Sequence, residues 1–173
     1  MTSRRLTLLK LIFIALFLAV AGLSDVSAAT VKEGAFVLLK KQGESYVQKG
    51  SFAKARAVYL KAQELELSPP DKQWVDFRVA DTQWRSQAGT NNPDRSKLEQ
   101  ARGKLQKMIR DQVRTEQQDR LWVEIQESLG DSWWFPRNSR NWSAAWAHYQ
   151  KALDWWGSAS DINLARTRYL NII

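Results

Sequence analysis

The chain has 173 residues, 44% of them hydrophobic and 25% charged, with a formal net charge of +8 and no cysteine. This length and composition are typical of one globular domain, and the missing cysteine excludes disulfides and thiolate metal sites. The basic residues are spread along the chain without a run of five or six like charges. Because a nucleic-acid surface needs clustered cations, the sequence predicts no nucleic-acid partner.

Residues 1–28 have the pattern of a secretory signal peptide. Arg4, Arg5 and Lys10 precede an uncharged, almost wholly apolar run from Leu11 to Leu23, and small side chains follow up to Ala28. The run is shorter than the roughly 20 residues of a spanning helix. We therefore expect export, with a bacterial periplasm or cell envelope as the destination. The alternative is an uncleaved N-terminal anchor, which would be the chain's one contact with a membrane.

A pattern of small and aromatic residues occurs three times in the remainder, in the same order, and the last three members are separated by the same two spacings in every copy. The copies are Gly43, Tyr46, Ala55, Tyr59 and Ala62; Ala80, Gln83, Ala101, Leu105 and Met108; and Gly130, Trp133, Ala145, Tyr149 and Ala152. Copies differ in the middle gap, where Gly89 to Asp94 and Phe135 to Arg140 are rich in turn-forming residues.

Such spacing predicts pairs of antiparallel helices. Two helices approach closely where a small residue lies at their crossing, and the residue four positions after the second small residue fills the space one turn away. The predicted fold is all-α. It has pairs over residues 33–69, 71–112 (with a long loop near 86–95) and 116–157, then an incomplete unit or capping helix over 160–173.

The first copy, from Gly43 through Gly50-Ser51-Phe52 and Ala55 to Tyr59, Ala62 and Pro69, resembles a tetratricopeptide repeat. Leu129-Gly130-Asp131 with Ala145, Tyr149 and Ala152 resembles a second one. This resemblance implies an α-solenoid that binds a protein or peptide in a concave groove. The Trp-rich segment from Asn141 to Trp156 is also similar to the leading region of some bacterial alpha-2-macroglobulin-like proteins, which would make further domains of a longer chain possible.

Catalytic chemistry is not indicated. His148 is the single histidine, and without cysteine it forms neither a common zinc set nor a nucleophile–base pair. Glu124, Glu127 and Asp131 share a helical face, a spacing more typical of a solvated surface than of paired catalytic carboxylates. We therefore expect no enzyme activity, no metal and no cofactor. Trp133, Trp142, Trp146 and Trp155 have spacings that favour buried seams, with a carbohydrate-binding platform as the alternative.

The repeat resemblance assigns the groove to the first helix of each pair. The expected partner-binding residues are Lys40, Glu44, Val47, Trp74, Phe77, Asp81, Trp84, Arg85, Glu127, Asp131, Trp134 and Tyr169. Trp84, Trp134 and Tyr169 occupy equivalent positions and predict an aromatic row, and Glu44, Asp81 and Asp131 predict an acidic row beside it. These rows favour an extended peptide or amphipathic helix with basic and apolar side chains. The alternative is an envelope carbohydrate-binding module or enzyme accessory that uses the same groove.

Overall fold

A computed structural model describes residues 33–110, 118–136 and 139–173, so the predicted signal peptide at 1–28 lies outside the described residues. A helix covers residues 33–48. It is followed by α2 (Phe52–Gln63), α3 (Pro69–Ala88), α4 (Arg95–Arg110), α5 (Arg120–Trp134), α6 (Trp142–Gly157) and α7 (Ile162–Ile172). These described segments contain no β-strand, which confirms the all-α class. None of the helices in them is both long and apolar enough to cross a membrane.

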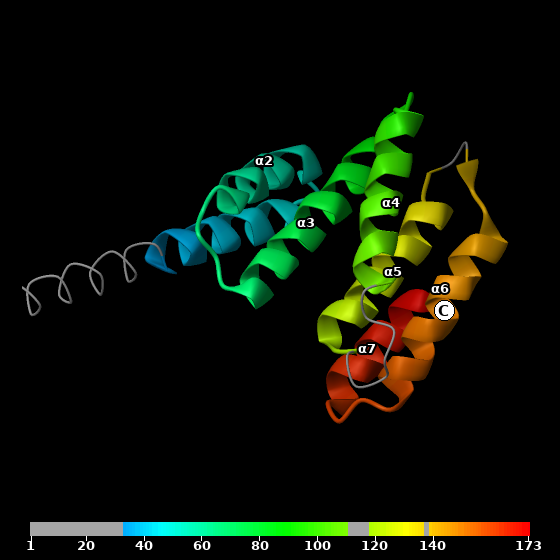
Figure 1. Cartoon of the computed structure of the whole chain (residues 1–173). Coiled ribbons are helices and arrows are strands. Elements are labelled where there is room, and N and C mark those ends of the chain that lie inside the picture. Colours follow the sequence, from blue (N-terminus) through cyan, green and yellow to red (C-terminus); the bar gives the residue numbers. More distant parts are fainter. Residues whose placement is uncertain (1–32, 111–117, 137–138) are drawn as a thin grey trace, which may run out of the picture.

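Each helix packs mainly against the helices that precede and follow it in the sequence, and α3 also contacts α5. The hairpins consequently lie side by side, from the N-terminal pair at one end of the molecule to α6 and α7 at the other (Figure 1). Successive first helices of the pairs, at residues 33–48, α3 and α5, are thereby brought near one another although they are far apart in the chain.

Short polar residues begin most of these helices. The side chains of Asp119, Asn141 and Asp161 accept a hydrogen bond from a backbone N–H in the first turn of α5, α6 and α7. Ser68 does the same for α3, whose first turn contains Pro69 and Pro70. Each cap satisfies a donor that the helix itself leaves unpaired. Because proline is well tolerated in the first turn, α3 begins at Pro69, slightly before the predicted start at residue 71.

The predicted helix crossings are confirmed at both glycines. A methyl group placed on Gly43 would lie 2.3 Å from the Tyr59 ring, and one on Gly130 would lie 2.3 Å from the Tyr149 ring. Ala55 and Ala145, one turn before these tyrosines, are fully buried. In the first and third pairs, the second helix therefore rests directly on glycine backbone.

The middle pair solves the same packing problem with different residues. Ala80 replaces the glycine and Leu105 replaces the tyrosine, and both are fully buried together with Ala101. Trp84 completes this part of the core, where it is packed with Leu98 and Leu129. A larger residue at the crossing is thus matched by a smaller one opposite it.

Candidate partner-binding groove

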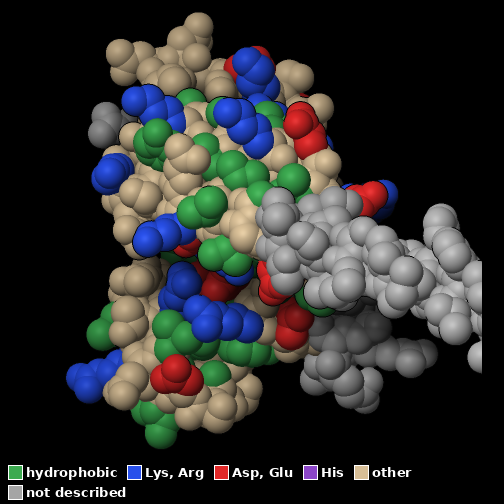
Figure 2. Space-filling view, turned by 90° about the vertical axis from the view of Figure 1, so that its left-hand side faces the viewer, with side chains coloured by type: hydrophobic (Ala, Val, Ile, Leu, Met, Phe, Trp, Pro, Cys, Tyr) green, Lys and Arg blue, Asp and Glu red, His purple; other side chains and the backbone are tan. Residues whose placement is uncertain are grey.

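A surface groove of about 410 Å³ lies between the first helices of the three pairs. Its lining comes from the helix at 33–48, from α3 and from the first turn of α5: Lys40, Glu44, Trp74, Arg78, Arg120, Leu121 and Glu124. The face seen in Figure 2 is hollowed between an upper and a lower part, and both basic and acidic side chains gather in the hollow. Three of the predicted partner-binding residues, Lys40, Glu44 and Trp74, line the groove together.

Trp74 provides the aromatic part of this groove. Its ring packs edge-on against Tyr59 at 5.6 Å and against Phe36 at 6.3 Å, so the core fixes its orientation. The Lys40 Nζ lies 4.4 Å from the ring centre and the Arg78 guanidinium lies 5.2 Å from it. Both distances are within the range of cation–π attraction. One partly buried ring therefore holds two cations at the groove.

The carboxylate of Glu44 joins the first pair to the second. Its Oε1 accepts a hydrogen bond from the Tyr59 hydroxyl at 2.9 Å and forms an ion pair with Arg78 at 3.0 Å. Burial, with the neighbouring Glu44 charge, raises the pKa of Tyr59, so this hydroxyl stays protonated and remains a donor. Gly43 makes room for the Tyr59 ring. The hydroxyl of that ring then lies against Glu44, the residue that follows Gly43 in the chain.

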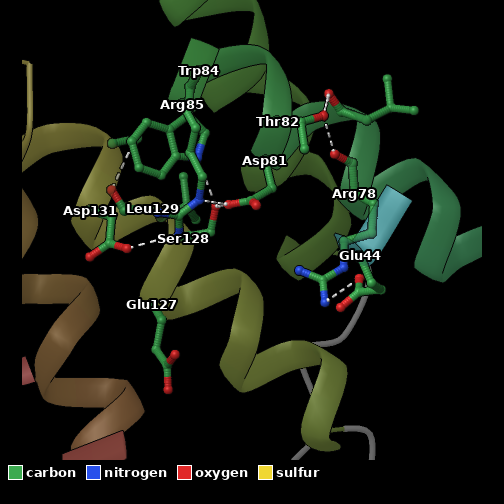
Figure 3. Close-up of polar contacts among 12 residues, drawn as sticks. Glu44, Arg78, Asp81, Thr82, Trp84, Arg85, Glu127, Ser128, Leu129 and Asp131 are labelled. Carbon is green, nitrogen blue, oxygen red and sulfur yellow. Dashed lines mark hydrogen bonds and ion pairs between the residues drawn. The ribbon is translucent and has the colours of Figure 1, made fainter. Parts of the chain in front are cut away.

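The same hydroxyl–carboxylate bond recurs in the third pair, formed by α5 and α6. The Tyr149 hydroxyl donates to Asp131 at 2.8 Å, and Arg85 lies between two carboxylates, 2.9 Å from both Asp81 and Asp131. Figure 3 shows this arginine between its two partners, with Ser128 beside Asp81. Burial raises the pKa of Asp131, and the Arg85 charge opposes that shift. Arg85 is therefore the cation that allows two largely buried acids to lie close together.

A third set of charges connects α5 to α7. Arg168 forms an ion pair with Glu127 at 3.0 Å and a longer one with Glu124 at 3.7 Å. Glu124 also forms an ion pair with Arg120 at 3.1 Å, and Glu127 accepts a hydrogen bond from the Trp156 indole. Every acid of the predicted acidic row and its extension along α5 thus already has an arginine partner.

The predicted aromatic row is interrupted, because Trp84 is buried in the core whereas Trp134 and Tyr169 are exposed. Trp84 is 1% exposed and donates its indole N–H to Ser128, and Phe77 is 2% exposed. Both are core side chains that a partner of the folded chain would not reach, because they fill the space between α3, α4 and α5. Trp134 lies edge-on to Trp142, and Tyr169 borders a separate hollow on α7. Asp81 is likewise only 2% exposed.

Four of the groove residues were not predicted as partner contacts: Arg78, Arg120, Leu121 and Glu124. Arg78 follows Trp74 by one helical turn, so the helical period alone places both on one face of α3. Arg120 and Leu121 have no such signal, because their position depends on how closely the start of α5 approaches the first pair. Val47, which was predicted, is partly buried in the core of the first pair.

The tryptophans are less buried than predicted. Trp142 is 51% exposed and Trp146 is 38% exposed, and their rings stack on each other with centres 5.5 Å apart. The expectation that these two lie in buried seams is therefore wrong. Trp133 and Trp155 are half-buried, the first beneath the Arg102 guanidinium at 3.7 Å.

His148 is half-buried between α6 and α5, with its Nδ1 2.8 Å from the side-chain oxygen of Gln126. Burial and the Lys151 charge lower its pKa to about 4, so the imidazole is neutral near pH 7. Within the described residues, no group of histidine or carboxylate side chains is arranged to hold a metal ion.

Comparisons with protein-family models, with curated proteins and with solved structures gave no match for this chain. Its class is therefore stated from the fold and the groove alone: an all-α protein of successive helix hairpins with a charged groove across their first helices.

Proposed function

We propose that this chain is an exported, non-catalytic helical-repeat scaffold of the tetratricopeptide type, which binds a protein or peptide segment in the groove around Trp74. The observation that supports this function most directly is the origin of the groove lining, since it comes from three different helix pairs. Such a surface combines side chains from several pairs, and it exists only when the pairs are stacked.

The crossings support the tetratricopeptide assignment. Gly43 with Tyr59 and Gly130 with Tyr149 are equivalent in position, in contact and in the hydroxyl–carboxylate bond that follows. Two separate stretches of sequence reach the same geometry, as expected of repeated units.

Selection of random displayed peptides on the purified chain tests the groove. We expect the selected peptides to lose at least about tenfold in affinity for a Lys40→Ala/Arg120→Ala variant, because both side chains line the groove. The matched control is Lys54→Ala/Lys151→Ala, which removes two exposed lysines outside the groove. Peptides that bind the groove variant as tightly as the native chain would contradict the proposed site.

Export is tested separately. When the whole chain is produced in a bacterium, we expect it in the periplasmic fraction with Ala29 as its first residue by mass spectrometry. A chain that keeps its first 28 residues and stays with the membrane would favour the anchor instead.

One observation favours carbohydrate binding as a second candidate function. Trp134, Trp142 and Trp146 are all at least one-third exposed and form a continuous aromatic surface, with the Arg140 guanidinium 4.9 Å from the Trp134 ring centre. Exposed apolar patches of this kind usually mark a binding surface. Titration with glycans should quench tryptophan fluorescence in the native chain and not in Trp142→Ala/Trp146→Ala if this candidate is correct.

A further inference from the structure

We infer that the groove around Trp74 selects an acidic segment of its partner, one that carries a carboxylate side chain beside an apolar one. This inference rests on the proposed function and specifies the ligand for the same groove. It replaces the sequence-based expectation of a basic ligand.

Each of the two carboxylates of the groove already pairs with arginine through one of its oxygens. Glu44 Oε1 accepts from both the Tyr59 hydroxyl and Arg78. Glu124 Oε1 is shared in the same way by Arg120 and Arg168. A basic ligand would therefore meet carboxylates whose charge is already balanced by arginine, and displacing one of these arginines would leave it without its partner. The cost of an unpaired, partly buried charge opposes such binding.

The cations of the groove have donors to spare. Lys40 forms no ion pair with any carboxylate of the described residues, and its ammonium rests on the Trp74 and Phe36 rings. Arg78 pairs with Glu44, and its Nε has no acceptor but is buried, so a ligand would not reach that donor. The Arg120 side chain is 63% exposed and meets Glu124 through its Nε, so its terminal guanidinium donors are open to a ligand on the solvent side.

The formal charge of the groove also favours an acidic ligand. Three cations and two carboxylates line the groove, which leaves it positive while its acids are satisfied. A ligand carboxylate between Lys40 and Arg120 would add charge-assisted hydrogen bonds without breaking any that the structure contains. Trp74 and Leu121 offer apolar surface beside these cations, which suits a neighbouring apolar side chain of the ligand.

The test uses three labelled synthetic peptides that alternate phenylalanine with a second residue, which is glutamate, glutamine or lysine. Fluorescence anisotropy at low ionic strength measures their affinity for the whole chain. We expect the glutamate peptide to bind at least about tenfold more tightly than the other two, and this preference to shrink as salt is added. Lys40→Glu/Arg120→Glu should reverse the order of the glutamate and lysine peptides.

A matched control separates the groove from the general basic charge of the protein. Lys72→Glu/Lys104→Glu changes the net charge equally, and it alters a different hollow, of about 570 Å³, between α3 and α4. The glutamate preference should survive in this control. If it is lost there and kept in the groove variant, acidic ligands bind the other hollow and the inference is wrong.

The remaining outcomes are also decisive. A lysine or glutamine peptide that binds most tightly, and does so less well to Lys40→Ala/Arg120→Ala, would overturn the acidic ligand and leave the groove in place. No measurable binding of any peptide, together with no groove-dependent peptides from the display selection, would refute both proposals. Circular dichroism checks that each variant is folded. If Lys40→Glu/Arg120→Glu does not fold, Lys40→Gln/Arg120→Gln takes its place.

Discussion

The helix crossing at Gly130 gives the sharpest stability prediction. Gly130→Ala places a methyl group 2.3 Å from Cε1 and 2.5 Å from Cδ1 of the Tyr149 ring. These atoms belong to the body of a ring that is 4% exposed and whose hydroxyl is bound to Asp131 at 2.8 Å. The ring therefore has little freedom to move away, and we place the steric cost at about 3 kcal/mol, the upper end for overpacking in a core.

Gly103→Ala is the matched control, because Gly103 lies within α4 and a methyl group there meets nothing within 4 Å. Alanine stabilises a helix interior by about 1 kcal/mol relative to glycine. Gly103→Ala should therefore raise the free energy of unfolding by about 1 kcal/mol. Gly130→Ala gains the same helix preference and should lower that free energy by about 2 kcal/mol net.

Urea unfolding followed by far-ultraviolet circular dichroism measures both variants, which we expect to differ by about 3 kcal/mol. Adding Tyr149→Leu to Gly130→Ala copies the Ala80–Leu105 crossing of the middle pair. Tyr149→Leu should thus be tolerated better in the Gly130→Ala background than beside the native glycine, with a coupling of about 2 kcal/mol. If Gly130→Ala is as stable as Gly103→Ala, Tyr149 does not rest on Gly130 and the proposed basis of the hairpin packing is refuted.

Three further predictions follow from the buried contacts. Trp84→Ala should lower the free energy of unfolding by about 3–5 kcal/mol in urea titrations, because it empties a core site and removes the donor to Ser128. Arg85→Met should cost about 3 kcal/mol, since it leaves two buried acids without their cation, and the loss should be smaller at acidic pH, where a carboxyl can take up a proton. His148 has a folded pKa of about 4, below its unfolded value, so its contribution is complete above about pH 6.5 and is lost as the pH falls toward 4. Urea titrations at pH 7.5 and 5 should show His148→Gln losing less stability on acidification than the native chain, by about 1 kcal/mol after allowance for partial exposure; an equal loss would contradict the neutral buried imidazole.

The helix class and the crossings were predictable because they depend on local chemistry. Helix ends follow from prolines, aspartates and asparagines that act within one turn of where they stand in the chain. Gly43 and Gly130 were found from spacing alone, since a close helix crossing needs a residue without a side chain. The period of the α-helix then indicates which residues face that crossing.

The exposure of the aromatic residues was not predictable by the same route. Trp84, Trp134 and Tyr169 occupy equivalent positions in the sequence pattern, yet their exposed fractions are 1%, 36% and 42%. Side chains at equivalent positions point in the same direction from their own helix. What covers them depends on the next helix, and Trp84 is covered by α4 and α5 whereas Tyr169 lies on α7.

The arginines explain why the structure favours a different ligand from the one that the sequence pattern favours. Sequence spacing placed Glu44, Asp81 and Asp131 in one row, and a row of acids favours a basic ligand. Arg78 reaches Glu44 and Arg85 reaches Asp131, each from a neighbouring first helix, and Arg168 of α7 reaches Glu127 of α5 in the same way. A charge pattern read along one helix omits the side chains that arrive from its neighbour. Stacking the pairs therefore cancels the acidic row, and among the cations that line the groove it leaves Lys40, over Trp74, without an acid from the described residues.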